Sequence, residues 1–238
     1  MIRKSISNHL NNMKDKNYYS GVNAVPNIPL VKKYISEASC VFEIGANDGV
    51  DIPSIHELWP DAEIHVFEIE PFHYPRLFRF MSEYIHVNFF GLYNYDGKVK
   101  FNRILEDNKS FDQYDYWYKT ASGIKKLCSY MGQPKPNTDL VNCNVLTIDT
   151  YCNLFKCKPD ILLMDTQGSE YEILQGAKKT LEDVKAILFE WSTVELYKDM
   201  KYFSDIQELL ESYNFIMKEK INLWGDWHGD AIFSRENV

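Results

Sequence analysis

Acidic side chains stand at or just beyond the ends of several apolar runs in this sequence. If those runs are parallel strands, their carboxyl ends meet at one edge of a sheet, which is where α/β proteins bind ligands. Carboxyl groups gathered at such an edge can bind a cofactor and take part in proton transfer. The residues concerned are Glu43, Asp48, Glu68, Asp165 and Glu190.

The first apolar run leads into the turn Gly45-Ala46-Asn47-Asp48-Gly49. A strand, a glycine turn and a helix are typical of a nucleotide-type cofactor site. A dinucleotide turn needs a middle glycine so that the backbone can approach a pyrophosphate, and this turn has side chains there. Two carboxylates, Glu43 and Asp48, would repel a phosphate. They would suit the amino and sulfonium groups of S-adenosylmethionine, which we therefore expect as cofactor.

A third acid supports a nucleoside-type ligand. Glu68 ends the second apolar run, 23 positions after Gly45. This is close to the spacing at which an acidic residue binds the hydroxyl pair of a ribose. A carboxylate there favours a cofactor with a free 2′-hydroxyl and disfavours a 2′-phosphate.

The elements that must position these residues alternate along the chain. Helical patterns separate the strands, so we predict an α/β fold with a doubly wound, mostly parallel sheet. The last two strands are close enough to form a hairpin, which makes the final strand antiparallel. The expected strands are 40–45, 63–70, 85–93, 160–165, 185–191, 214–223 and 229–235.

The stretch 94–145 interrupts this alternation. A hairpin turning at Asp96-Gly97 is expected near its start. The rest has no clear period, and an insertion of this kind is usually a lid or binding loop. Its aromatic residues are candidates for lining an acceptor cleft: Tyr114, Tyr116, Trp117 and Tyr118. We expect an N-terminal arm and helix over 1–37 and one domain over 38–238 that contains this insertion.

Composition limits the partners. The chain has 238 residues, a formal charge of −8 and a pI near 5.3, so nucleic acid or an anionic membrane is a poor partner. Five cysteines lack a zinc-finger spacing and are expected to be reduced thiols in a cytoplasmic protein. No signal peptide or membrane-spanning segment is predicted. The oligomeric state is left open.

The motifs together resemble the FkbM-type methyltransferases over roughly 38–235. The resemblance rests on "VFEIGANDG", "VFEIEPFHYPRL", "VLTIDTY", "ILLMDTQGSEYEILQGAKKTL", "ILFEWSTVELY" and "GDAIFSR". It implies a Rossmann-like class I methyltransferase fold and S-adenosylmethionine as cofactor. By this resemblance Glu43, Gly45, Asn47 and Gly49 fall on the cofactor turn, and Glu68 falls on the ribose-binding acid. The motif after the fourth strand corresponds to Asp165, Gln167, Gly168 and Glu170.

The sequence departs from the family pattern at two places. The family usually has a lysine two residues before the motif aspartate, where this chain has Leu163. The family's "FEPNP" is here "FEIEP", so Ile69 and Glu70 differ. The first difference puts any role of that lysine in doubt, and the second adds a carboxylate without an evident task.

Candidate catalytic residues follow from methyl transfer to a hydroxyl, which gains from positioning and from a base. Asp165, which we also count among the cofactor-binding residues, is the first choice, either as the base or as a group that orients the acceptor. The alternative is that it caps a helix or holds the loop through backbone amides. Glu170 is a second candidate or simply an acid of a first helical turn. His228, at a loop tip beside Trp224 and Trp227, suits proton transfer and sugar stacking or else an aromatic cap.

Metal binding has less support. Asp165, Glu170 and Glu190 could together bind a divalent cation through oxygen ligands, but no spacing demands it, and no metal ligands are assigned. His65 and His86 alternate within strands and are expected to be structural.

We therefore expect an S-adenosylmethionine-dependent O-methyltransferase. Its acceptor would be a hydroxyl of a sugar, a glycoconjugate or another small molecule. One alternative is an NAD-dependent oxidoreductase of Rossmann type, which the acidic turn and the missing glycine disfavour. The other is a non-catalytic partner subunit that retains cofactor binding.

Overall fold

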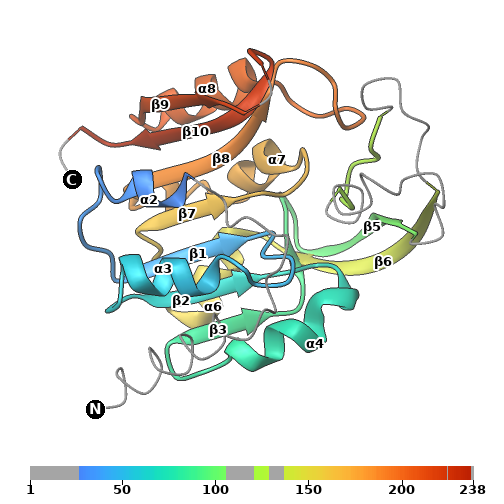
Figure 1. Ribbon diagram of the computed structural model, residues 1–238, viewed down its shortest axis with the longest axis horizontal. Coiled ribbons are helices and arrows are strands. Elements are labelled where there is room, and N and C mark those ends of the chain that lie inside the picture. Colours follow the sequence, from blue (N-terminus) through green and yellow to red (C-terminus); the bar gives the residue numbers. More distant parts are fainter. Residues whose placement is uncertain (1–26, 106–120, 129–136, 224, 237–238) are drawn as a thin grey trace.

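The computed structural model describes residues 27–105, 121–128, 137–223 and 225–236. The expected N-terminal arm before residue 27, the aromatic residues of 114–118 and Trp224 lie outside these ranges. The central sheet has the order β3-β2-β1-β7-β8-β10-β9 (Figure 1). Its strands are β1 (Cys40–Ile44), β2 (Glu63–Phe67), β3 (Ile85–Asn88), β7 (Ile161–Met164), β8 (Ala186–Ser192), β9 (Ile216–Asn222) and β10 (His228–Ser234).

The strand directions confirm the predicted doubly wound, mostly parallel sheet. Strands β3, β2, β1, β7 and β8 pair in parallel, whereas β10 is antiparallel to both of its neighbours, β8 and β9. The chain order reverses between β1 and β7. The carboxyl ends of these two strands therefore form the switch point at which such sheets bind ligands.

Helices cover both faces of the sheet, and each face has its own apolar core. One face carries α2 (Ile28–Val31), α3 (Ile52–Leu58), α4 (Tyr74–Leu77) and the short 3-10 turns η1 (Pro71–His73) and η2 (Phe78–Phe80). The other face carries α6 (Ile148–Phe155), α7 (Glu170–Gln175), η3 (Thr180–Glu182) and α8 (Phe203–Ser212). Within the described ranges, no helix is long and apolar enough to cross a membrane.

A second sheet lies beyond the carboxyl ends of the central strands (Figure 1). It has the order β4-β6-β5 and consists of β4 (Gly91–Leu92), β5 (Gly97–Ile104) and β6 (Thr138–Leu146). Part of the stretch that interrupts the alternation therefore forms a small sheet of its own.

The hairpin predicted at Asp96-Gly97 is wrong, because β6 lies between β4 and β5 and pairs with both. The Asp96 carboxylate accepts hydrogen bonds from Thr147 N at 2.7 Å and from Thr150 Oγ1 at 2.8 Å. Asp96 therefore anchors the start of β5 to the first turn of α6. Because these distant partners hold Asp96, the Asp96-Gly97 pair does not need to form the turn of a hairpin.

Candidate active site

The turn after β1 has its shape fixed by glycine. Gly45 has φ +88°, and a Cβ atom there would lie 1.9 Å from the carbonyl oxygen of Asp165. Only glycine fits where the ends of β1 and β7 come this close. Gly49 has φ +81° and donates its backbone N–H to Ala46 O at 2.8 Å, which closes the turn. Asn47, between them, also has a positive φ of 52°.

Two buried carboxylate oxygens at this turn have no hydrogen-bond partner among the described residues: Glu43 Oε2 and Asp48 Oδ1. Burial raises the pKa of Glu43 well above its usual range, and the nearby Asp51, Glu68 and Asp48 raise it further. A positive charge lies beside the turn at Arg76, whose Nη1 is 4.0 Å from the other oxygen of Asp48. A carboxyl group in such surroundings ionises readily only when a cation binds beside it.

Glu68 follows β2 directly and holds two segments of backbone. Its Oε2 accepts a hydrogen bond from Asn47 N at 2.7 Å, and its Oε1 accepts one from Glu70 N at 2.6 Å. Burial raises the pKa of Glu68 to about 7, although these backbone hydrogen bonds act to lower it. Each carboxylate oxygen has a second lone pair. Glu68 can therefore shape the turn and still accept hydrogen bonds from a ligand.

Glu70, whose task was not evident from the sequence, binds Arg103 of β5. Arg103 Nε lies 2.9 and 3.0 Å from the two carboxylate oxygens of Glu70, and Arg103 Nη2 lies 2.7 Å from Oε1. Glu70 Oε1 also accepts a hydrogen bond from Phe72 N at 3.2 Å and caps η1. This two-pronged ion pair joins the second sheet to the turn that follows β2.

A second group of polar residues comes from β7, β8 and β10. Asp165 directly follows β7, and Glu190 of β8 stands opposite Asp230 of β10 in the register. His228 Nε2 lies 3.3 Å from Glu190 Oε1. Asp230 Oδ2 accepts a hydrogen bond from Asn27 Nδ2 at 2.6 Å. We call Asp165, Glu170, Glu190, His228 and Asp230 the acceptor-side cluster.

The charges of this cluster influence one another. Burial raises the pKa of Asp165 well above its usual range, followed by the nearby Glu190, Glu170 and Asp230. Burial, Glu170 and Asp230 have the same effect on Glu190. Burial lowers the pKa of His228, while the surrounding acids oppose that change. Because like charges this close resist joint ionisation, these carboxyl groups raise one another's pKa.

The loop after β7 holds the Asp165 side chain in place. Gln167 Nε2 donates to Asp165 Oδ1 at 2.5 Å, and Gln167 Oε1 accepts a hydrogen bond from the hydroxyl of Tyr197. Glu170 Oε1 accepts from both Thr166 N and Thr166 Oγ1 at 2.9 Å. Glu170 therefore stabilises the loop, whereas Asp165 is oriented by a side chain that is itself held.

Residues 121–128 of the stretch 94–145 pack against this loop. A Cβ atom on Gly123 would be 3.2 Å from Cβ of Gln167. Lys125 is buried and donates through Nζ to Glu172 Oε1 at 2.7 Å and to Asp199 O at 2.6 Å. The insertion is therefore attached at the acceptor side of the sheet.

The structure separates the predicted site residues into two groups. Glu43, Gly45, Asn47, Asp48, Gly49 and Glu68 form or adjoin the turn after β1, and Asp165, Glu170 and His228 belong to the acceptor-side cluster. Gly45 links the groups through its contact with the Asp165 backbone.

The prediction that His228 lies at a loop tip is wrong. It begins β10 and is only 6% exposed, with its ring 5.6 Å from that of Trp227.

Sequence reasoning missed Asp230, Asn27 and Tyr197. Asp230 could have been found, because an acid interrupts the apolar residues of the last strand. Asn27 and Tyr197 gave no signal, because their partners lie 203 and 30 positions away, respectively.

Asp165, Glu170 and Glu190, considered above as a cation site, do not form a group with metal-ligand geometry within the described ranges. The one such group in those ranges consists of Glu63, His65 and His86.

Comparison with known proteins identifies the family. The model of the methyltransferase FkbM domain matches residues 43–217. The chain belongs to the FkbM methyltransferase family. It is an S-adenosylmethionine-dependent methyltransferase with the Rossmann-like class I fold, and this replaces the NAD-dependent alternative.

Individual relatives are distant. The 2-O-methyltransferase NoeI of Sinorhizobium fredii (strain NBRC 101917 / NGR234) is 24% identical over 189 residues, which cover 78% of this chain and 76% of that protein. The Burkholderia thailandensis 1,6-didemethyltoxoflavin-N1-methyltransferase is 11% identical with a TM-score of 0.47, covering 98% of this chain and 86% of that one. Aeropyrum pernix fibrillarin with bound S-adenosyl-L-methionine is 12% identical with a TM-score of 0.44, covering 83% and 66%.

The turn of this methyltransferase fits its cofactor. The unpartnered oxygens of Glu43 and Asp48 offer acceptors for a cationic amino group, and a cation bound there would favour the ionised form of Glu43, whose pKa is raised by burial and by neighbouring acids. The free lone pairs of Glu68 suit ribose hydroxyls. When bound, the cofactor supplies an activated methyl group, and residues of this chain would position the atom that receives it.

Proposed function

We propose that this methyltransferase transfers the methyl group to a hydroxyl of a sugar or glycoconjugate. The observation that carries the proposal is the acceptor-side cluster, which places carboxyl groups and an imidazole next to the cofactor turn. An alcohol, unlike an amine, needs a base to take its proton as the oxygen attacks carbon. The raised pKa of the cluster's carboxyl groups suits them to that task, because a carboxylate with a higher pKa is a stronger base.

Asp165 has the central role in this proposal. Its backbone carbonyl lies against Gly45 of the cofactor turn, so its side chain starts beside the cofactor. Gln167 fixes one carboxylate oxygen and leaves the other for the acceptor hydroxyl. We infer that Asp165 orients the hydroxyl and accepts its proton. The negative charge of Glu190, whose side chain lies 3.3 Å from that of His228, stabilises the protonated form of Asp165.

The similarity to NoeI supports an oxygen acceptor, because that protein is a 2-O-methyltransferase. At 24% identity the match indicates a class of acceptor atom and not a particular compound.

The test is a transfer assay with methyl-labelled S-adenosylmethionine over a panel of glycans, glycolipid headgroups and small alcohols. We expect label on a hydroxyl oxygen, identified by the carbon shift of the new methyl group. Asp165→Asn should lower kcat by about 10²–10⁴-fold, since it removes a general base. Its affinity for S-adenosylhomocysteine, measured by calorimetry, should remain close to that of the unchanged protein.

Asp183→Asn is a matched control, because Asp183 pairs on the surface with Lys158 at 2.8 Å. It should retain full activity. Label on nitrogen or carbon alone would contradict the proposal of a hydroxyl acceptor. Cofactor binding without turnover on any hydroxyl of the panel would favour the partner-subunit alternative, and full activity of Asp165→Asn would remove Asp165 from the chemistry.

A further inference from the structure

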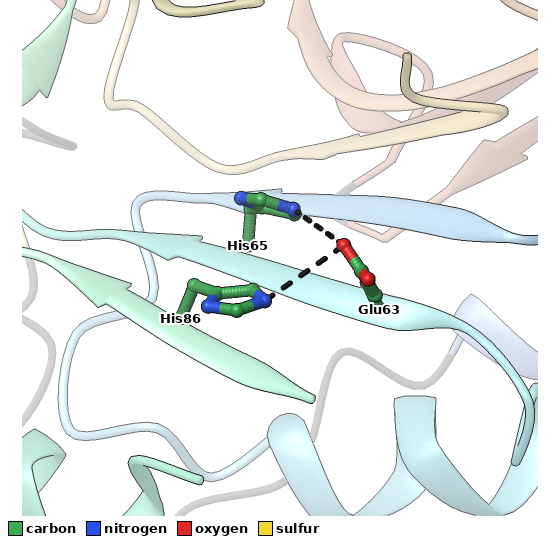
Figure 2. Close-up of side chains that lie close together, drawn as sticks. All are labelled: Glu63, His65 and His86. Carbon is green, nitrogen blue, oxygen red and sulfur yellow. Dashed lines mark ion pairs between the residues drawn. The ribbon is translucent and has the colours of Figure 1, made fainter. Parts of the chain in front are cut away.

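A second group of ligand-type side chains lies at the other end of β2, outside the active site. Glu63 and His65 lie two residues apart on β2 and so point to the same face of the sheet. His86 stands directly beside His65 in the parallel register with β3, the edge strand. Figure 2 shows the three side chains converging on the Glu63 carboxylate.

The distances are close to those of a coordination sphere. Glu63 Oε2 lies 3.6 Å from His65 Nε2 and 3.8 Å from His86 Nε2. All three ligand atoms lie within 4.8 Å of one another. Tetrahedral Zn²⁺ with bonds of about 2.0–2.1 Å separates its ligand atoms by roughly 3.3 Å. A contraction of a few tenths of an ångström would bring each imidazole nitrogen to that distance from the carboxylate oxygen.

The Nε2 atom of the His65 ring has no hydrogen-bond partner among the described residues. The Nδ1 atom of the same ring lies 2.7 Å from the Tyr151 hydroxyl, while Nε2 is buried. The side chain is only 5% exposed.

In the tautomer in which Nδ1–H donates to the Tyr151 hydroxyl, the lone pair of His65 lies on Nε2 and faces the Glu63 carboxylate. A cation between these two acceptors would be bound by both. Anchoring of the far ring nitrogen by a hydrogen-bonding group is also the usual arrangement around a metal-binding histidine.

We propose that Glu63, His65 and His86 bind one divalent transition-metal ion of the Zn²⁺ type through Oε2, Nε2 and Nε2. Imidazole and carboxylate are ligands that Zn²⁺ accepts. The side chains of Glu63 and His86 are 53% and 40% exposed, so the metal can enter from solvent, and a water molecule completes the fourth position.

The metal is structural in this position and takes no part in methyl transfer. Glu63 begins β2 and Glu68 follows its last residue, so about 16 Å of strand separates the metal from the cofactor turn. The ion would join the edge strand β3 to β2 through His86. The expected effect is on the stability of this edge, and cofactor affinity should be unchanged.

The experiment uses the full chain after treatment with a chelator and its removal. Titration with Zn²⁺ in a calorimeter should show one strong site, and Co²⁺ should give the visible absorption of a tetrahedral complex. His86→Ala and Glu63→Gln should each abolish that site, and both residues are exposed enough for the variants to fold. Tyr151→Phe should weaken binding by about 10–100-fold, as expected for loss of an outer-sphere partner.

Glu208→Gln on the exposed face of α8 is the matched control and should bind like the unchanged protein. Zn²⁺ at about 100 times its dissociation constant should raise the Tm by about 5–10 °C, and the rise should vanish in His86→Ala. Absence of a stoichiometric site would overturn the proposal. So would Zn²⁺ binding that is equally strong in His86→Ala and Glu63→Gln, because the ion would then lie elsewhere.

Discussion

The cofactor turn and the acceptor-side cluster both use acidic residues, but different parts of the chain hold them. At the turn, backbone N–H groups of Asn47 and Glu70 hold the Glu68 carboxylate, and all of these residues lie close in sequence. In the cluster, side chains contact side chains, and strand pairing brings Asp230 beside Glu190. In the proposed function, the shape of the backbone at the turn determines how the cofactor is bound. The charges within the acceptor-side cluster set the pKa of the carboxyl group that acts on the acceptor.

The strongest way to break the turn is to add a side chain at Gly45. We expect Gly45→Val to abolish cofactor binding and to lower the free energy of unfolding by more than about 4 kcal/mol, because its Cβ would meet a backbone oxygen. That oxygen, Asp165 O, is 1.9 Å from the Cβ position. Thermal melting and calorimetry with S-adenosylhomocysteine measure the two effects.

Gly176→Ala separates loss of stability from loss of binding. Its Cβ would lie 2.2 Å from Tyr93 O, away from the turn. It should destabilise the protein while the folded fraction binds cofactor normally. If Gly45→Val binds cofactor as tightly as Gly176→Ala does, the turn does not hold the cofactor.

A subtler change concerns the ionisation of Glu68. With a pKa of about 7, its carboxyl group is mostly protonated below pH 6 and mostly ionised above pH 8. Ribose hydroxyls donate to the ionised form, so cofactor affinity should rise with pH through 7. Because only about one molecule in eleven is ionised one unit below the pKa, affinity at pH 6 should be about tenfold lower than at pH 8.

Glu68→Gln should remove this step and give a flat profile between pH 6 and 8. The raised pKa of Glu68 affects folding stability in the opposite direction: affinity for the cofactor rises with pH, whereas stability falls. Burial favours the protonated group, so its contribution to stability is present below its unfolded pKa and is lost as the pH rises through about 7. A pH profile of affinity that is unchanged in Glu68→Gln would assign the ionisation to another group.

The smallest expected effect concerns the ion pair between the two sheets. Arg103→Gln leaves Glu70 buried without its cation, and the free energy of unfolding should fall by about 1–3 kcal/mol. Urea unfolding measures it. Lys158→Gln, which breaks an exposed pair with Asp183, is the control and should leave the free energy of unfolding nearly unchanged. Equal effects of the two variants would mean that the pair to Glu70 contributes no more than a surface contact.

The comparison also explains what the sequence could predict. The turn and Glu68 were predictable because glycine spacing and the distance between successive strand ends are local properties of a strand-helix-strand unit. Asp165 was predictable because its strand is an unbroken apolar run. Asp230, Asn27 and Tyr197 depend on which strands and loops become neighbours, and no local pattern records that.

The wrong hairpin prediction has the same origin. An Asp-Gly pair favours a tight turn, but Asp96 accepts hydrogen bonds from Thr147 and Thr150, more than 50 positions away. The structural role expected for His65 stays a prediction, because alternation in a strand gives a face without giving the residue opposite. Its position beside His86 depends on the register of two strands that are separated by a helical segment.

The place of β10 has a consequence for the order in which the protein is made. On the ribosome β9 emerges before β10, yet β10 lies between β8 and β9 and is the strand that joins them. Until β10 is synthesised, β9 has no partner in the central sheet, while the strands around the cofactor turn already have theirs. His228 and Asp230 arrive on that same last strand. The nascent chain can therefore assemble its cofactor half first, and the acceptor half is completed only by its final insertion step.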